Sequence, residues 1–513
     1  MNFPKKSFCL ALCLGLITLI AADDLTQKRA EATIRFLADD LLEGRATPSH
    51  GLDIAALYLA GELQAAGWQP ANGGSYLQEY TLKSFAPQTT KYTISINGVT
   101  LDAKDFTFVP IGMDPELSPF QYRLVFAGHG IFAPERKVDD FAGIDIKGKA
   151  VVSLFGAPWP LDPAIIHGYD RGLGKAVHAT VRGGKFLIYV SEEFASPPGS
   201  VASAEVALLR DYASMPLSYL PEFKGNFAMG VSPCLILVPS AFDKTLAKAA
   251  GGTYTEWQKR LARKRFKAKA LDASIEVRVE TKPQSGKASN VAAMLTGIDP
   301  QLKDEWIVLS AHYDGLGSMA TPPGQDGIYN GADDNASGTA AMLEAARRLA
   351  GAKPRRSVLI LFFSGEEMGL LGSGHYSFHP LVPRGRIVAN INADMVGRSS
   401  GNVYGIAAGC DEMFNEAARI GKQKGIEVLP DPNPSWRLIY FIDSYHVARF
   451  NVPYIEFFTE MHKEYHQPTD EVGLIRYPEL GRIIDLITGL ADYFAQGGKK
   501  PLFKRPSWFL TAD

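Results

Sequence analysis

The stretch Trp306-Ile-Val-Leu-Ser-Ala-His-Tyr-Asp314 runs from apolar and small residues into three polar ones. An apolar run of this length, with β-branched residues, predicts a buried strand. The same pattern recurs where Ser357–Phe363 runs into Ser364-Gly-Glu-Glu367, and where Ile387–Ala393 runs into Asp394. Buried strands that end in polar residues are typical of an α/β sheet with a site at its carboxyl edge.

Helical segments separate these strands. The helices that we expect cover 336–349, 369–378 and 478–494, and a further strand covers 452–458. Strands that alternate with helices in this way indicate a sheet covered by helices on both faces. The fold class predicted for the C-terminal part of the chain is therefore α/β.

The segment 121–270 differs in texture, because short β-rich runs are broken there by Gly and Pro. The strands expected within it are 123–126, 150–155, 186–190 and 234–238. We expect a small β-rich domain at 121–270, inserted between residues 23–120 and 271–513, which together form the main domain.

The N-terminus predicts export. Lys5 and Lys6 precede an apolar run from Phe8 to Ala22, which is the order of residues in a secretory signal peptide. We expect cleavage after Ala22, so that residues 1–22 are lost. The run of about 15 apolar residues is shorter than the ~20 that a membrane-spanning helix needs. The expected product is periplasmic or extracellular and has no integral membrane segment after signal removal.

Charge and cysteine content exclude some classes of protein. The 513 residues include 53 Lys and Arg and 55 Asp and Glu, which gives a net charge of −2. This balance gives no reason to expect a nucleic-acid partner. Only Cys234 and Cys410 follow the signal segment. Two cysteines are too few for a disulfide scaffold, and we expect both to be free.

Histidine and carboxylates gather where the expected strands end, at His312–Asp314, Glu366–Glu367 and Asp394. These are ligand types that suit zinc. Two other segments carry the same residue types, Gly331-Ala-Asp-Asp-Asn-Ala-Ser-Gly338 and Tyr465-His-Gln-Pro-Thr-Asp470. Each segment alone could be a turn or a helix N-cap. Their order and their positions after strands favour a metal site.

These segments resemble those of the co-catalytic zinc aminopeptidases, which are related to glutamate carboxypeptidase and the secreted glutaminyl cyclases. The resemblance implies a mixed sheet sandwiched by helices, two zinc ions per chain and a cis peptide bond after the bridging aspartate, Asp334 rather than Asp333. The insertion, with Val138–Asp145, looks like a protease-associated domain. The ligands that the resemblance implies are His312, Asp334, Glu367, Asp394 and His466.

The resemblance also implies roles for residues that do not bind metal. Glu366 corresponds to the general base, Tyr465 to a tyrosine that helps to hold the oxyanion, and Asp314 to the carboxylate that orients His312. The implied activity is hydrolysis of the N-terminal residue of peptides that have a free N-terminus, whose ammonium group Asp394 and Glu366 help to receive. Where the family often has a histidine, this chain has Ser444.

Three alternatives stay open at this stage. A glutaminyl cyclase uses one zinc ion on the same scaffold, but it departs from the Asp-Asn-Ala-Ser-Gly pattern kept here. A carboxypeptidase needs arginines to bind a substrate carboxylate, and Arg398, Arg437 and Arg449 keep that possibility open. A non-enzymatic receptor should have lost ligands, whereas this chain matches all five. His462 belongs to no ligand pattern and is expected to be structural or exposed.

Overall fold

The computed structural model describes residues 25–86, 89–111, 113–134, 137–156, 172–192, 217–221, 232–262 and 266–509. The expected signal peptide, residues 1–22, lies outside these ranges. The described residues belong to two compact units. The first is drawn from Met1–Tyr80, Ala288–Pro432 and Asp443–Lys504, and the second from Thr81–Lys287, Asn433–Ile442 and Arg505–Asp513.

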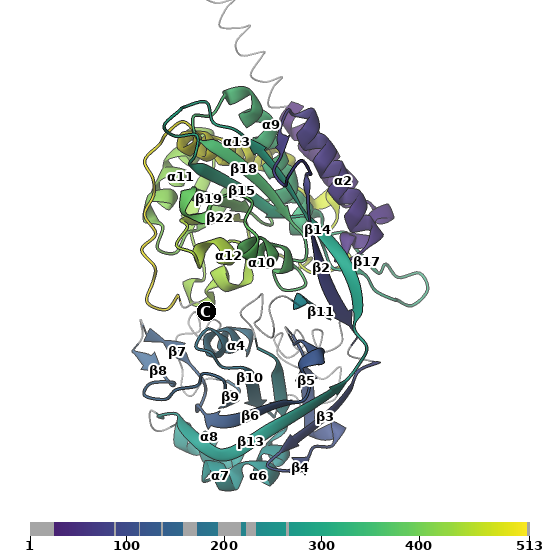
Figure 1. Cartoon of the computed structure of the whole chain (residues 1–513), viewed down its shortest axis with the longest axis vertical. Helices are drawn as coiled ribbons and strands as arrows, with labels where there is room; N and C mark the ends of the chain where they lie inside the picture. Colours follow the sequence, from purple (N-terminus) through teal and green to yellow (C-terminus); the bar gives the residue numbers. More distant parts are fainter. Residues whose placement is uncertain are drawn as a thin grey trace, which may run out of the picture. The chain divides into compact units, whose positions relative to one another are not determined.

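The main sheet has ten strands, and Figure 1 labels those at its centre. Its path runs through β11 (Leu217–Tyr219), β2 (Leu77–Phe85), β14 (Gln284–Leu295), β18 (Ser357–Phe363), β15 (Trp306–His312), β19 (Ile387–Ala393), β22 (Tyr454–Phe458), β20 (Asn402–Ile406) and β21 (Glu427–Pro430), and β1 (Gln69–Pro70) pairs with β14. The central strands β18, β15, β19 and β22 are parallel, whereas β14 pairs antiparallel with β18 and β20 pairs antiparallel with β22. The sheet is therefore mixed, as expected.

The central strands are apolar because both of their faces are covered. Every residue of β18 and of β19 is buried, which is typical of parallel strands between two layers of helices. β15 pairs with β18 in a register that places His312 opposite Phe363, and it also pairs in parallel with β19. The carboxyl ends of these three strands therefore lie along one edge of the sheet.

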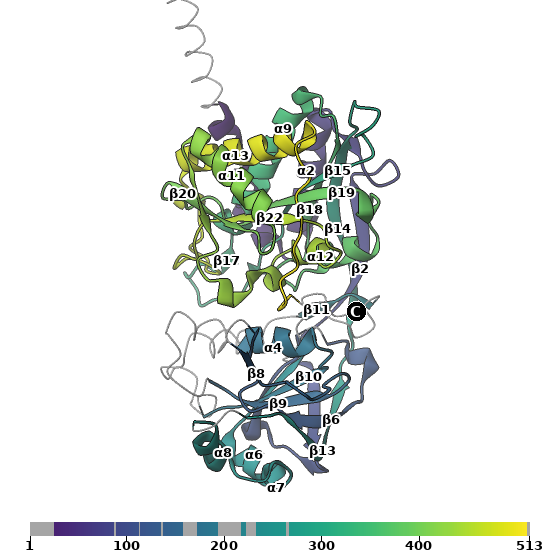
Figure 2. The same ribbon diagram turned by 90° about the vertical axis from the view of Figure 1, so that its left-hand side faces the viewer.

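Helices cover both faces of this sheet (Figure 2). One group consists of α2 (His50–Ala65), α9 (Gly338–Ala352), α11 (Asp411–Lys424) and α13 (Tyr477–Ala495), which contact one another. On the other face, Tyr376 of α10 (Leu371–Phe378) and Val447 of α12 (Tyr445–Ala448) share a core cluster with Val308 and Leu359 of the sheet. The expected sandwich is confirmed.

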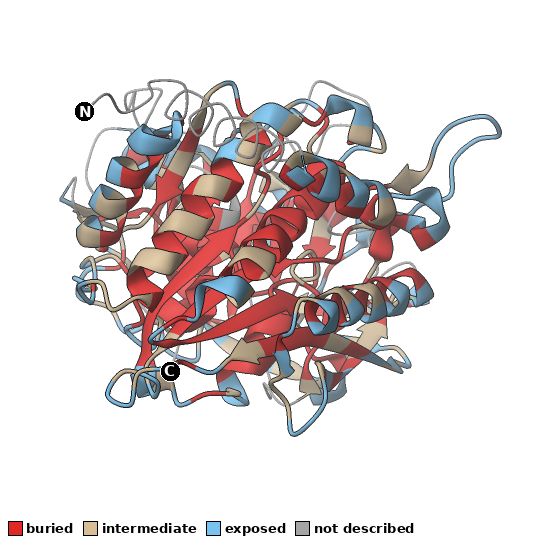
Figure 3. Cartoon of the chain, turned by 90° about the horizontal axis from the view of Figure 1, so that it is seen from above, coloured by how far each residue is buried: buried red, intermediate tan, exposed pale blue. Residues whose placement is uncertain are grey.

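α13 illustrates why the helices pack in this way. Four buried residues of α13 recur every three to four positions and form one apolar stripe along the helix. They are Leu480, Ile483, Ile487 and Leu490. Figure 3 shows the same arrangement, with buried residues on the helices next to the sheet and exposed residues on their outer turns. None of the helices in the described part of the chain has the length and apolar character needed to cross a membrane.

The second unit contains an eight-stranded sheet. In spatial order its strands are β4 (Val99–Thr100), β3 (Lys91–Ile96), β13 (Lys269–Glu280), β6 (Phe120–Phe126), β9 (Ala150–Leu154), β10 (Phe186–Val190), β12 (Cys234–Leu237) and β5 (Phe106–Val109). It also contains the strand pair β7 (Phe132–Ala133) and β8 (Val138–Asp139) and the helices α4 (Gly172–Thr180), α6 (Pro239–Thr245), α7 (Ala247–Ala250) and α8 (Tyr254–Leu261).

The second unit is wider than the insertion predicted at 121–270. The four strands expected there correspond to β6, β9, β10 and β12. β3 and β13 pair with each other and β13 pairs with β6, so residues outside the predicted borders share the same sheet. The identity of this unit as a protease-associated domain stays a prediction. Cys234 and Cys410 are buried, free and in different units.

Candidate metal centre

The five expected ligands lie at the carboxyl edge of the main sheet. His312 ends β15, Asp394 follows β19, and Glu367 follows β18. Asp334 lies in the turn before α9, and His466 lies in the segment between β22 and α13. Their side chains form two groups that could each hold a metal ion, and Asp334 belongs to both groups.

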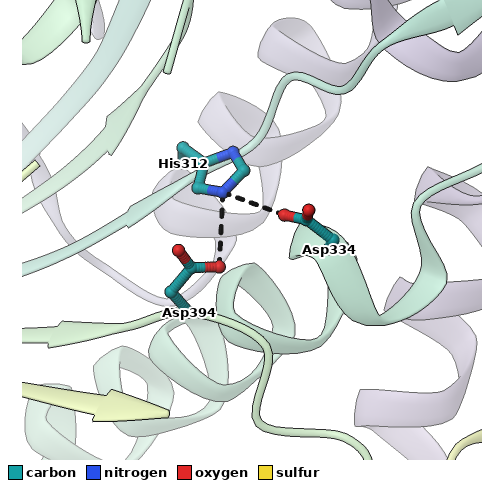
Figure 4. Close-up of side chains that lie close together, drawn as sticks. All are labelled: His312, Asp334 and Asp394. Atoms are coloured by element: carbon teal, nitrogen blue, oxygen red, sulfur yellow. Dashed lines mark ion pairs between the residues drawn. The ribbon is translucent and has the colours of Figure 1, made fainter. Parts of the chain in front are cut away.

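Each oxygen of the Asp334 carboxylate faces one histidine. In the first group, His312 Nε2 lies 3.3 Å from Asp334 Oδ1 and 3.4 Å from Asp394 Oδ1 (Figure 4). In the second, His466 Nε2 lies 3.3 Å from Asp334 Oδ2 and 3.2 Å from Glu367 Oε2. Asp334 therefore stands between the two groups, in the position of a bridging ligand.

The donor atoms of this cluster fit a divalent cation. His312 Nε2 and Asp394 Oδ1 are buried and have no hydrogen-bond partner among the described residues. Buried polar atoms without partners are uncommon and costly in proteins. Burial lowers the pKa of His466, but the negative charges of Glu367 and Asp334 outweigh burial and raise it to about 10. The surplus of negative charge attracts a cation, and imidazole and carboxylate donors suit zinc.

The neighbouring acid Asp333 belongs to neither group. Its Oδ1 accepts hydrogen bonds from the hydroxyl of Ser337 at 2.9 Å and from the N–H of Gly397 at 2.6 Å. Its Oδ2 lies 3.1 Å from His462 Nε2. The peptide bond between Asp334 and Asn335 is cis, as the resemblance implied.

The Asn-Ala-Ser-Gly motif joins the Asp334 turn to the end of β19. The side-chain amide of Asn335 donates to the carbonyl of Ala393 at 3.0 Å, and its Oδ1 accepts from the N–H groups of Gly338 at 2.9 Å and Met395 at 3.2 Å. A Cβ atom at Gly338 would overlap the carbonyl oxygen of Ala393. The motif is therefore more than a helix N-cap, since it sets the distance between Asp334 and Asp394.

Asp314 lies between the first histidine and the loop that follows β18. Its Oδ1 is 3.5 Å from His312 Nδ1 and accepts the N–H of Glu366 at 3.2 Å. Glu366 is partly buried and belongs to neither metal-binding group. Burial raises the pKa of Glu366 well above its ordinary value, and the charge of Glu367 adds to this shift while that of His312 opposes it.

Tyr465 and Asp470 flank His466 in the same segment. The ring of Tyr465 stacks on that of His466 with 3.8 Å between their centroids. Asp470 is buried, and its Oδ2 accepts the backbone N–H groups of Asp333 at 2.9 Å and Asp334 at 3.0 Å. Asp470 ends the motif Tyr465–Asp470, but nothing in that motif predicted that its side chain would hold the Asp334 turn.

Arg45 is a second residue that holds the backbone around the candidate metal centre and that the sequence did not point to. Its side chain is fully buried and donates to the carbonyls of Tyr313 at 2.9 Å, Asn330 at 2.7 Å and Gly331 at 3.2 Å, and to that of Leu37. Burial lowers the pKa of Arg45 to about 10, although nearby carboxylates oppose this shift. Its partners are backbone atoms up to 286 positions away, so no sequence pattern could identify it.

The expectation for His462 was incomplete. Its side chain is only 11% exposed and lies between two carboxylates, with Nε2 3.1 Å from Asp333 and Nδ1 3.2 Å from Glu464. Asp333 is 129 positions away, which explains why no local pattern pointed to this pair. Ser444, at the position where the family often has a histidine, donates its hydroxyl to buried Glu456 at 2.9 Å.

Comparison with known proteins finds similarity for this part of the chain. Residues 290–491 match the model of peptidase family M28. The chain is 38% identical over 109 residues to a probable zinc metalloprotease of Pyrenophora tritici-repentis (21% of this chain, 24% of the relative). It is 40% identical over 94 residues to aminopeptidase YwaD of Bacillus subtilis (18% of each chain). The chain thus spans a quarter or less of these curated relatives.

Several solved structures resemble the chain over most of its length. One of them is an aminopeptidase from Aneurinibacillus sp. strain AM-1, which is 19% identical in sequence. The likeness covers 94% of this chain and 96% of that chain, with a TM-score of 0.49.

Proposed function

We propose that this protein is a zinc-dependent aminopeptidase that removes the N-terminal residue from peptides. The observation that carries the proposal is the position of Asp334, whose two carboxylate oxygens each face a histidine and a second acid. We infer that His312, Asp334 and Asp394 hold one zinc ion and that Asp334, Glu367 and His466 hold another. The matches to a probable zinc metalloprotease and to an aminopeptidase support the zinc dependence and the activity.

Zinc would supply Lewis-acid chemistry, because bound ions polarise a carbonyl and lower the pKa of water. Glu366 would then act as the general base that takes a proton from the attacking water and returns it to the leaving amine. Burial raises the pKa of Glu366, which makes its carboxylate a stronger proton acceptor than that of an exposed glutamate. Asp314, 3.5 Å from His312 Nδ1, would fix the orientation of that ring. The hydroxyl of Tyr465 would donate to the substrate's carbonyl oxygen as negative charge develops there.

The same carboxylates explain a preference for a free N-terminus. A substrate ammonium group carries one positive charge, and Asp394 and Glu366 would offer negative charge on one side of the cluster. Acetylation of the peptide removes that charge. We therefore propose that substrates are peptides with a free N-terminus, and that the protein is exported by its N-terminal segment, residues 1–22.

The observations give less support to the two alternative activities, glutaminyl cyclase and carboxypeptidase. A one-zinc glutaminyl cyclase would leave one of the two groups around Asp334 without a role. For a carboxypeptidase, two of the candidate arginines are already paired. Arg398 donates to Glu464 at 3.2 Å, and Arg437 lies 2.7 Å from His178 within the second unit.

The test compares three peptides of one sequence: one with a free N-terminus, one acetylated, and one that begins with glutamine. We expect release of the first residue from the free peptide, at least tenfold slower cleavage of the acetylated one, and no cyclisation of the third. Elemental analysis of the purified protein should find two zinc ions per chain. One tightly held zinc ion together with cyclisation of the glutamine peptide would support the cyclase instead. Release of the C-terminal residue would support the carboxypeptidase.

A further inference from the structure

A loop far from the metal ligands in sequence contributes to the candidate centre. Residues 43–49, here called the N-terminal loop, comprise the irregular end of the 3-10 helix Asp40–Arg45 and the residues that lead from it to α2. Arg45 and Thr47 of this loop are buried, and Thr47 is only 2% exposed. Neither residue is a proposed metal ligand, and neither is the proposed general base.

The hydroxyl of Thr47 joins two segments of the centre. Thr47 Oγ1 donates to Asp314 Oδ2 at 3.2 Å and accepts the N–H of Gly365 at 3.0 Å. Asp314 belongs to the segment that follows β15, and Gly365 to the segment that follows β18. One hydroxyl therefore fixes the separation of two strand ends that are adjacent in the sheet.

Both of these segments carry groups that the proposed reaction needs. The other oxygen of Asp314 lies 3.5 Å from His312 Nδ1 and accepts the N–H of Glu366 at 3.2 Å. Gly365, which Thr47 holds, directly precedes Glu366. Thr47 thus contacts the carboxylate that faces the first histidine and the backbone that carries the general base.

The loop itself is held in place by Arg45, which donates to the carbonyls of Tyr313, Asn330 and Gly331 next to the segments of His312 and Asp334. Gly365 has a φ of +71°, and a Cβ there would meet the side chains of Leu371 and Tyr80. The position therefore requires glycine, and the hydrogen bond from its N–H to Thr47 is a contact that holds this backbone to the loop.

We propose that Thr47 is a positioning residue that sets Asp314 and Glu366 relative to each other and to His312. The proposal rests on the proposed aminopeptidase function. Without the hydroxyl, Asp314 Oδ2 and the N–H of Gly365 lose a partner in a buried environment, so both groups shift toward other partners. A general base that is displaced by a fraction of an ångström transfers a proton less efficiently, and a less constrained Asp314 orients His312 less well.

The test compares Thr47→Val, which removes the hydroxyl at nearly constant volume, with Thr47→Ser, which keeps it. For Thr47→Val we expect kcat to fall about 10–100-fold and KM to change less than threefold, because the loss concerns proton transfer rather than substrate binding. Zinc affinity, measured by competition with a chromogenic chelator, should fall as well. Thr47→Ser should keep both quantities within about threefold of the unsubstituted protein.

Thr180→Val is the matched control. Thr180 Oγ1 is also buried, donates at 2.7 Å to the carbonyl of Ala176 and accepts the N–H of Ser232 at 2.8 Å, all within the second unit. The Thr180→Val variant should have a lower melting temperature but the same kcat and zinc affinity as the unsubstituted protein. If Thr47→Val does not fold, Thr47→Ala removes the same hydroxyl without adding a methyl group and takes its place.

The outcomes separate the two proposals. The role of Thr47 is overturned if the folded Val or Ala variant keeps kcat and zinc affinity within twofold, or if Thr47→Ser loses as much as Thr47→Val. If the unsubstituted protein binds zinc but cleaves no peptide, the proposed function is wrong. Zinc affinity alone then decides the role of Thr47, through the difference between the Val and Ser variants.

Discussion

Asp333 and Asp334 are adjacent in sequence, but their carboxylates have different partners. Asp334 lies 3.3 Å from each of the two histidines His312 and His466. Asp333 instead lies 3.1 Å from His462 and accepts the N–H of Gly397. One acid therefore belongs to the candidate metal centre, and the other fastens the turn to the segment that carries His466.

Substitution of each acid by its amide should separate these roles. Asp334→Asn should lower the affinity for both metal ions and reduce activity at least 10²-fold, because the neutral amide is a poor bridging ligand. Asp333→Asn should keep the metal and instead lower the free energy of unfolding by about 1–3 kcal/mol, since a buried charged hydrogen-bond acceptor is lost. Elemental analysis and urea unfolding measure the two effects. Metal loss in Asp333→Asn alone would reverse the assignment.

Glu366 and Glu367 form a second pair of adjacent acids with separate expected roles. Glu367→Gln should weaken zinc binding and lower the rate, because Glu367 belongs to the group around His466. Glu366→Gln should keep two zinc ions and lower kcat by roughly 10²–10⁴-fold, the usual contribution of a positioned base. KM should change less than kcat, since proton transfer belongs to the transition state.

Metal content and steady-state kinetics on the two glutamine variants provide the measurement. A Glu366→Gln variant that loses zinc, beside a Glu367→Gln variant that keeps both zinc and activity, would show that the two roles are exchanged. If both variants keep full activity, neither acid takes part in the reaction.

The sequence predicted some elements of the fold to the residue and missed others entirely. β18 and β19 have the predicted bounds, because each is a continuous run of residues buried on both faces. The twelve-residue strands β13 and β14 were not expected. β13 alternates buried residues with exposed ones such as Asp272, and β14 begins with exposed polar residues, so neither forms a continuous apolar run.

The same distinction holds at the candidate centre. The ends of recognisable strands pointed to His312, to the Glu366–Glu367 pair and to Asp394 as candidates. The resemblance to a known family supplied the choice of Glu367 and the candidates Asp334 and His466. Arg45, Thr47 and Asp470 could be identified in neither way. All three make hydrogen bonds to backbone groups of residues far away in the chain, and any donor or acceptor in a loop could do the same.

Substitution of Arg45 should therefore affect stability more than its position in a loop suggests. Lysine keeps the charge but has only three donors and lacks the planar fork, so it cannot satisfy all of the carbonyls that Arg45 binds. Arg45→Lys should lower the free energy of unfolding by about 1–3 kcal/mol. Urea unfolding measures this change. The control is Arg35→Lys at an exposed position, where the free energy of unfolding should stay within about 0.5 kcal/mol of that of the unsubstituted protein. Equal effects would mean that the buried contacts of Arg45 contribute little.

The pair formed by His462 and Asp333 should make stability depend on pH. Burial lowers the pKa of His462, but the hydrogen bond and charge of Asp333 outweigh burial, and the pKa is raised above its ordinary value. A raised pKa means that the folded protein binds the proton more tightly than the unfolded chain does. The contribution of the pair to stability is therefore fully present below about pH 6.5, the ordinary value for histidine, and is lost as the pH rises through the higher value in the folded state.

His462→Gln removes the titrating group, and its effect should consequently shrink as the pH rises. We expect the difference in the free energy of unfolding between the unsubstituted protein and His462→Gln to be larger at pH 5.5 than at pH 9. Urea unfolding at both pH values measures this difference. The control is the same substitution in an Asp333→Asn background, where most of the dependence on pH should disappear because the partner charge is absent. A difference that grows with pH, or one that persists unchanged without Asp333, would show that the charge of His462 does not hold this turn to its neighbouring loop.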